Sequence, residues 1–96
     1  MTIYFVTRHP GALYWAKKHG IAFNQHCEHL DVADIKSGDK VIGSLPINLA
    51  AKVCVRGAEY WNLSIELPKE QRGKELSAEV LEQLSASIEE YKIEKM

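Results

Sequence analysis

Apolar residues are clustered along the chain in short runs that predict strands, separated by stretches with a helical spacing. Residues 3–7 form a nearly continuous apolar run, and residues 40–45 (KVIGSL) form a second one. Runs of this kind are typical of strands covered on both faces of a sheet. Two less regular stretches, 23–30 and 60–67, complete a prediction of four strands, the last of which stops at Pro68.

Three other stretches have the spacing of amphipathic helices. The first covers residues 10–19 and is followed by Gly20, the second begins at Pro46 and ends at Arg56–Gly57, and the third is capped by Ser77. A charged tail after the third helix is expected to fray. The residues predicted to face the core are Ala12, Trp15, Ala16 and His19, then Ile47, Ala50, Ala51 and Cys54, then Leu81, Leu84, Ile88 and Tyr91.

This alternation of strands and helices predicts a small α/β fold, a three-layer sandwich with a mainly parallel, four-stranded sheet. The 96 residues suffice for a single domain, 1–96, with one modest core. Residues 31–39 are expected to form a loop or a short turn of helix.

Composition excludes several classes of protein. The hydrophobic fraction of 46% and the charged fraction of 26% are ordinary for a globular chain. No apolar run approaches the length of a membrane span, and the first residues lack the pattern of a signal peptide, so we expect a cytoplasmic protein without a membrane partner. Cys27 and Cys54 are too few for a disulfide scaffold and are expected to be buried thiols.

The charge balance argues against binding of long nucleic acid. The chain has 12 basic and 13 acidic residues, and a net charge of −1 does not hold a polyanion by bulk electrostatics. Residues 1–57 nevertheless contain seven Lys or Arg and four Asp or Glu, whereas residues 58–96 contain five and nine. The expected ligand is therefore a small anion bound by the first half of the chain.

The first candidate site is Thr7-Arg8-His9-Pro10-Gly11, which follows the first strand. Proline suits the first position of a helix, so this segment places an arginine and a histidine at a helix N-terminus, where anions bind. The arginine fork matches phosphate, and histidine moves protons near neutral pH. The alternative is a surface arginine followed by a histidine that caps the helix.

A second strand-turn-helix segment, Gly43-Ser44-Leu45-Pro46, has the same arrangement. Ligands of parallel sheets bind beyond the carboxyl ends of the strands, so this turn is predicted to form the second wall of a phosphate pocket. Gly43 would allow close approach of the ligand and Ser44 would offer a hydroxyl, unless Ser44 only caps the helix. Asn48, in the first turn of that helix, would reach a base or ribose, or face solvent.

Metal binding is the less favoured interpretation of residues 26–29 (HCEH). In an extended strand the first and third side chains point to one face and the others to the opposite face, so the four do not converge. Asp31, Asp34 and Asp39 lack the spacing of a magnesium or calcium site and are interpreted as solvated charges. No metal or other cofactor is expected.

Two further features have competing interpretations. Arg72-Gly73-Lys74-Glu75 would bring positive charge over a ligand as a lid, or be a solvated turn. Tyr60 and Trp61 would stack on a base, or belong to the core or a subunit interface.

Four ordered motifs together resemble a known family. They are TRHPGA at 7–12, IGSLPINLAA at 42–51, RGAEY at 56–60 and RGKEL at 72–76. Their order and separations resemble a small CRISPR-associated family found beside type III systems, and this resemblance covers nearly the whole chain.

The resemblance implies a ring nuclease, which binds and linearises the second messenger cyclic tetra-adenylate without metal. It also implies a homodimer with a Rossmann-like fold related to CARF sensor domains, with Thr7, Arg8, His9, Ser44 and Pro46 at the ligand-facing strand ends. Candidate interface aromatics are Tyr14, Trp15, Tyr60 and Trp61. The expected catalytic residues are Arg8, His9 and Ser44, and the expected substrate-binding residues are Thr7, Pro10, Gly11, Gly43, Leu45, Pro46, Asn48 and Arg72.

Two alternatives to this function stay open. Histidine phosphatases also place Arg-His after their first strand, but Pro10 intervenes here and the chain is short for the second histidine and arginine of such a site. The other alternative is a non-catalytic sensor or sponge that binds the cyclic messenger with the same residues.

Overall fold

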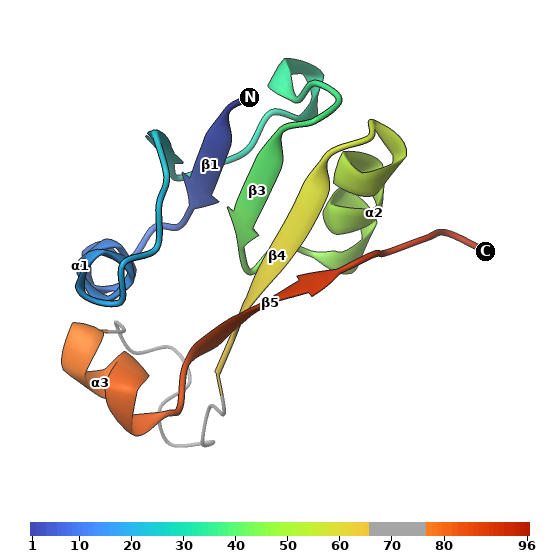
Figure 1. Ribbon diagram of the computed structural model, residues 1–96. Coiled ribbons are helices and arrows are strands. Elements are labelled where there is room, and N and C mark those ends of the chain that lie inside the picture. Colours follow the sequence, from blue (N-terminus) through green and yellow to red (C-terminus); the bar gives the residue numbers. More distant parts are fainter. Residues whose placement is uncertain (66–76) are drawn as a thin grey trace.

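The computed structural model describes residues 1–65 and 77–96. It confirms an α/β fold in which strands and helices alternate (Figure 1). The elements are, in chain order, β1 (Ile3–Val6), α1 (Pro10–Lys18), β2 (Gln25–Cys27), the 3₁₀ turn η1 (Val32–Asp34), β3 (Lys40–Gly43), α2 (Ile47–Val55), β4 (Glu59–Ser64), α3 (Ala78–Gln83) and β5 (Ser87–Tyr91).

The strands form one mostly parallel sheet with the order β2-β1-β3-β4-β5. β1 pairs in parallel with β2 and β3, and β3 pairs in parallel with β4. The chain therefore leaves β1 to form β2 on one side and returns to form β3 on the other. In a sheet of this order the carboxyl ends of β1 and β3 mark the point where the connections diverge, and ligands bind there.

The four-stranded count is wrong, because the third predicted helix is half as long as its apolar spacing indicated. α3 ends at Gln83, and Ser85 then adopts a left-handed backbone with φ of 54° that turns the chain back. Residues 87–91 pair antiparallel with β4, placing Ile88 opposite Leu63. The edge of β4 offers backbone groups that pair with residues 87–91, and the helical spacing of the apolar residues in this segment gives no sign of that pairing.

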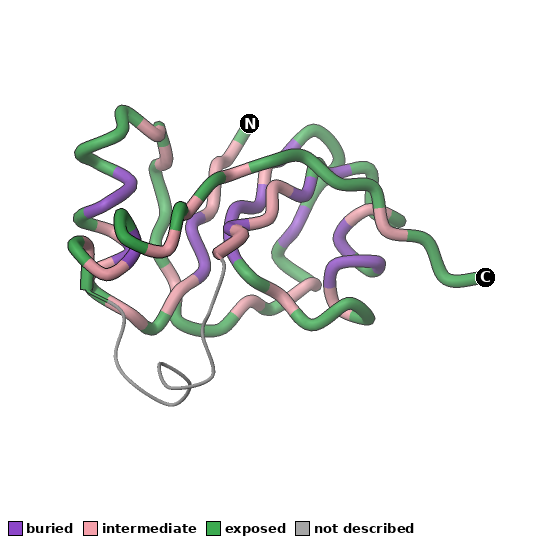
Figure 2. Tube along the Cα trace, turned by 90° about the horizontal axis from the view of Figure 1, so that it is seen from below, coloured by how far each residue is buried: buried purple, intermediate pink, exposed green. Residues whose placement is uncertain are grey.

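Helices cover both faces of the sheet, so the three layers are confirmed. α1 and α3 lie together on one face and α2 lies on the other (Figure 1). Buried residues line the strands and the inner sides of the helices, while the last residues of the chain are mostly exposed (Figure 2). The core cluster beneath α1 and α3 contains Phe5, Ala12, Trp15, Ala16, Ile42, Leu63 and Leu81; the second, beneath α2, contains Val6, Ile35, Val41, Ala50, Val53, Ala58 and Tyr60.

The predicted helix faces are only partly correct. Ala12, Trp15 and Ala16 of α1 are buried as expected, and Gly20 follows the helix with φ of 70°. In α2 the buried side includes Val53, whereas Ile47 is 73% exposed. The buried stripe of α2 is thus rotated away from the predicted one.

Other predicted elements need smaller corrections. The second strand is confirmed but covers only Gln25–Cys27, and η1 confirms a helical turn within 31–39. Asp39 is buried, and its carboxylate accepts hydrogen bonds from the Thr2 and Lys36 amides at 2.9 Å each. The interpretation of Asp39 as a solvated charge is therefore wrong. In the described ranges, no helix combines the length and apolarity needed to cross a membrane.

Candidate functional site

The loops after β1 and β3 border a cleft of about 550 Å³ at the carboxyl edge of the sheet. Its polar wall carries an arginine, two histidines, a glutamate and a serine, while its floor is apolar. The lining residues are Val6, Thr7, Arg8, His9, Ala12, Glu28, His29, Leu30, Ser44, Leu45, Pro46, Leu49, Leu63, Ile65 and Leu81.

The cleft brings together both halves of the predicted phosphate pocket. The predicted residues at its lining are Thr7, Arg8, His9, Ser44, Leu45 and Pro46. The helices α1 and α2 begin directly after these residues, so the positive ends of two helix dipoles lie at the same edge of the sheet.

Other predicted binding residues lie elsewhere. Pro10 and Gly11 line a separate hollow beside α3, and Asn48 lines a groove between α2 and the last residues of the chain. Gly43 is buried against β1, as described below, and Arg72 lies outside the described residues. Pro10, Gly11, Gly43 and Asn48 do not line the cleft, so its geometry does not support a role for them in binding.

One backbone and one side-chain contact from β2 fix the loop that carries Arg8. The Thr7 amide donates to the Cys27 carbonyl at 3.0 Å, and the His26 imidazole lies 3.0 Å from the Thr7 carbonyl oxygen. The Thr7 hydroxyl in turn accepts a hydrogen bond from the His9 amide at 3.1 Å. Since the His9 ring makes no capping bond within the described chain, its imidazole remains available to a ligand.

Gly43 is buried where β3 lies against β1, and its lack of a side chain serves strand packing. A Cβ atom at this position would lie 2.6 Å from the Val6 carbonyl oxygen, which is closer than such atoms approach. The missing side chain therefore lets β1 and β3 lie side by side at the rim of the cleft.

The Ser44 hydroxyl does not cap α2. It donates to the Leu63 carbonyl of β4 at 2.6 Å, while the adjacent Leu45 amide donates to the Tyr60 hydroxyl at 3.1 Å. A tyrosine hydroxyl is protonated at neutral pH, and burial raises the pKa of Tyr60 further above its ordinary value. The Leu45 amide is thus occupied and does not face an anion in the cleft.

The aromatic residues proposed to stack on a base do not face the cleft. Tyr60 is 3% exposed and belongs to the core, and Trp15 is buried on the inner side of α1, so neither serves as an interface aromatic. Trp61 is half-buried and carries the Lys40 ammonium 4.3 Å from the centre of its ring. Only Tyr14 is largely exposed.

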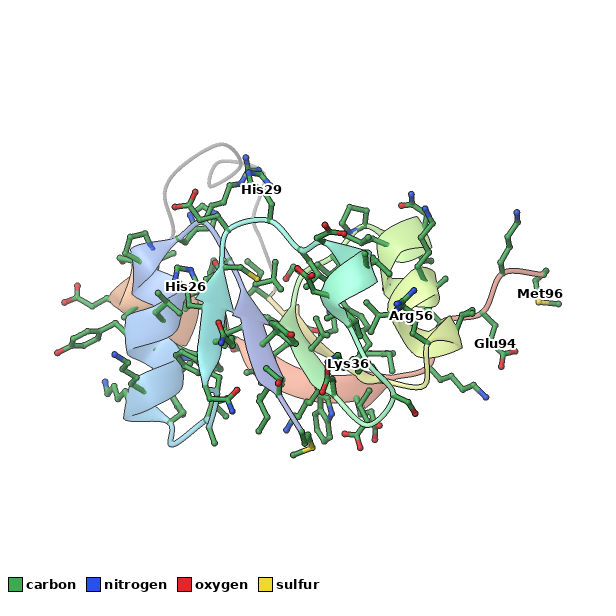
Figure 3. All side chains as sticks on the ribbon, turned by 90° about the horizontal axis from the view of Figure 1, so that it is seen from above. His26, His29, Lys36, Arg56, Glu94 and Met96 are labelled. Carbon is green, nitrogen blue, oxygen red and sulfur yellow. The ribbon has the colours of Figure 1, made fainter. Side chains whose placement is uncertain are left out.

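Sequence reasoning missed Glu28 and His29 as residues of the cleft. They lie just beyond β2, which ends at Cys27, and Figure 3 shows His29 at the carboxyl edge of the sheet. The HCEH segment spans the end of β2, the strand that pairs with β1, and residues at such a strand end are the signal for a third wall of the cleft.

The metal interpretation gains no support from the geometry. Among residues 1–65 and 77–96, no group of three His, Cys, Asp or Glu side chains converges as metal ligands would. Burial, with a smaller contribution from Asp34, raises the pKa of the Cys27 thiol, which disfavours the thiolate needed for ligation.

The cleft can hold a phosphodiester and move protons around it. Arg8 supplies a fork of donors, the Ser44 turn lines the same cleft, and His9 and His29 provide two imidazoles. The apolar floor, which includes Leu30, offers a surface for a base.

One comparison identifies relatives of the chain. A family model described as "Putative CRISPR-associated protein (Cas_VVA1548)" matches residues 4–94. Searches of curated proteins and of solved structures returned no match.

Proposed function

The chain belongs to this family of CRISPR-associated proteins, and from that premise we propose that it is a ring nuclease for cyclic tetra-adenylate, acting in the cytoplasm. One observation carries the proposal: Arg8, His9 and Ser44 line a single cleft at the β1–β3 edge of the sheet. Arginine, imidazole and helix N-termini at one cleft suit a phosphodiester that is bound and then transferred.

The reaction needs no nucleophile from the protein. A ribose 2′-oxygen attacks the adjacent phosphorus, so the O2′–P bond forms and the P–O5′ bond breaks. The proton of the 2′-hydroxyl passes to a base, and a proton is delivered to the leaving 5′-oxygen. The product is a linear adenylate with a 2′,3′-cyclic phosphate at one end and a 5′-hydroxyl at the other.

Each part of the cleft has a role in this reaction. Arg8 would stabilise the charge that develops on the phosphoryl oxygens, an effect of about 3–4 kcal/mol for one well-placed donor. His9 and His29 would serve as the base and the acid, each contributing on the order of a hundredfold or more. Ser44 would align the phosphate by turning its hydroxyl proton from the Leu63 carbonyl to a phosphoryl oxygen, and holding the 2′-oxygen in line with the leaving oxygen adds a large entropic contribution.

A homodimer is part of the proposal, because a symmetric ring suits two identical clefts related by a two-fold axis. Exposed apolar side chains offer a candidate contact surface on α2, where Ile47 is 73% exposed and Val55 is 82% exposed, and Tyr14, 71% exposed on α1, offers another on the opposite face of the sheet. Sedimentation with cyclic tetra-adenylate is expected to give a dimer at micromolar concentration, and a monomer alone would contradict this part.

The proposal is tested with labelled cyclic tetra-adenylate in EDTA, at stoichiometric and substoichiometric amounts of protein. Multiple turnovers to a linear product with a cyclic phosphate end are expected. Retention of the intact ring would instead indicate the non-catalytic sensor or sponge. Failure to bind the ring would reject both functions.

A further inference from the structure

A tyrosine that does not reach the cleft holds the turn between β3 and α2 from behind. The Tyr60 hydroxyl accepts a hydrogen bond from the Leu45 amide at 3.1 Å, and its one proton is shared between two acceptors, the Gly43 carbonyl oxygen at 3.2 Å and the Asn62 side-chain oxygen. Its ring belongs to the core cluster beneath α2. Tyr60 thus contacts the residues on both sides of Ser44, although it is not itself part of the cleft lining.

Further contacts join the same turn to β4. The Ser44 hydroxyl donates to the Leu63 carbonyl at 2.6 Å, the Asn62 side chain contacts the Tyr60 hydroxyl, and Asn62 Nδ2 lies 2.8 Å from the Ser64 hydroxyl. Removing the Tyr60 oxygen would leave the part-buried Leu45 amide without the partner that it has in the structure. Such an unsatisfied group is costly, so the turn is expected to shift until it finds another partner.

Resting on the ring nuclease function proposed above, we infer that Tyr60 is a positioning residue for Ser44. Its hydroxyl sets the backbone of the Gly43–Leu45 turn and thereby the position of Ser44 within the cleft that also contains Arg8. A displacement of about 1 Å at a reacting group can cost about a hundredfold in rate. Loss of the hydroxyl therefore lowers kcat more than it raises KM.

The experiment compares Tyr60→Phe with the control Tyr4→Phe. Tyr4 packs against the same cluster, and within the described residues its hydroxyl makes no hydrogen bond to the Gly43–Leu45 turn. Two readouts are measured: kcat and KM for cyclic tetra-adenylate, and the hydrogen exchange rate of the Leu45 amide by NMR. Tyr60→Phe is expected to lower kcat by about tenfold to a hundredfold and to speed Leu45 exchange, whereas Tyr4→Phe changes neither.

An unchanged kcat in folded Tyr60→Phe overturns the inference, even if Leu45 exchanges faster. If the wild type leaves the ring intact, the proposed function fails, and Leu45 exchange alone decides: faster exchange in Tyr60→Phe supports positioning of the turn by Tyr60 and unchanged exchange rejects it.

If Tyr60→Phe does not fold, the wild type is examined for a nuclear Overhauser contact between the Tyr60 hydroxyl proton and a slowly exchanging Leu45 amide. Observing this nuclear Overhauser contact supports the inference. A Leu45 amide that exchanges rapidly and shows no such contact overturns it.

Discussion

Arg8 and Asp39 are both charged residues beside a strand of the sheet, yet the structure uses them in opposite ways. Arg8 is exposed at the carboxyl edge of the sheet, where it lines the cleft. Asp39 is buried before β3, where its carboxylate joins the amides of Thr2 and Lys36. One charge is thus available to a ligand, and the other is committed to the fold.

Replacing Arg8 by alanine is expected to lower kcat for cleavage of cyclic tetra-adenylate by about a thousandfold, because charge stabilisation in the transition state is lost. His9→Ala is expected to cost less, about a hundredfold, since a second imidazole lines the same cleft. Single-turnover rates check both values. Lys17→Ala, an exposed change on α1 outside the cleft lining, is the control; an Arg8→Ala variant as fast as this control would move the site to the Ser44 turn.

The pH dependence of stability is expected to depend on Asp39. Hydrogen bonds from the Thr2 and Lys36 amides lower the pKa of Asp39 below its usual value of about 3.9. Its contribution to stability is therefore complete above that value and is lost as the pH falls through the lower pKa of the folded state.

In urea titrations, Asp39→Asn should be less stable than the wild type at pH 7, and the difference should shrink at acid pH. Asp34→Asn, which changes an exposed acid in η1, serves as the control. A constant difference between Asp39→Asn and the wild type at all pH values would contradict the assignment.

At the scale of elements, α1 and α3 end in the same way with different residues. Gly20 follows α1 with φ of 70°, and Ser85 follows α3 with φ of 54°. In both cases the next amide bonds back into the helix, from Ile21 to the Ala16 carbonyl and from Ala86 to the Leu81 carbonyl. Glycine predicts such an end from sequence, whereas serine does not, which is why the third helix was predicted to continue.

Exchanging these two residues gives a reciprocal prediction. Ser85→Gly should raise the free energy of unfolding by about 1 kcal/mol, because serine is strained in the left-handed region and glycine is not. Gly20→Ser should lower it by a similar amount. Urea denaturation measures both, and equal stability of Ser85→Gly and the wild type would show that Ser85 is not strained.

The contact of β1 with β3 leads to another prediction at this scale. Gly43→Ala would place a methyl group against the Val6 carbonyl oxygen, where a Cβ atom has only 2.6 Å. Backbone atoms cannot move aside as a side-chain end can, so the free energy of unfolding should fall by about 1–3 kcal/mol. A stability within error of the wild type, measured by thermal unfolding, would contradict this.

For the whole molecule, the strand-end rule was enough to predict that two distant segments meet. Apolar runs identified β1 and β3, and because both are parallel, Arg8 and Ser44 had to lie at the same edge. Glu28 and His29 were not predicted, since their position depends on where a three-residue strand stops. β5 was missed because its pairing partner, β4, lies far away in sequence.

The inner position of β1 and β3 also determines how the cleft responds to disturbance. β1 is bonded to β2 and β3, and β3 to β1 and β4, so each strand beneath the cleft has a neighbour on both sides. Breathing of β5, the edge strand that makes no contribution to the cleft lining, then leaves the spacing between the two walls unchanged. Mild heating or low denaturant that loosens only β5 should accordingly leave ligand affinity intact, and that affinity should vanish together with the cooperative melting of the whole domain.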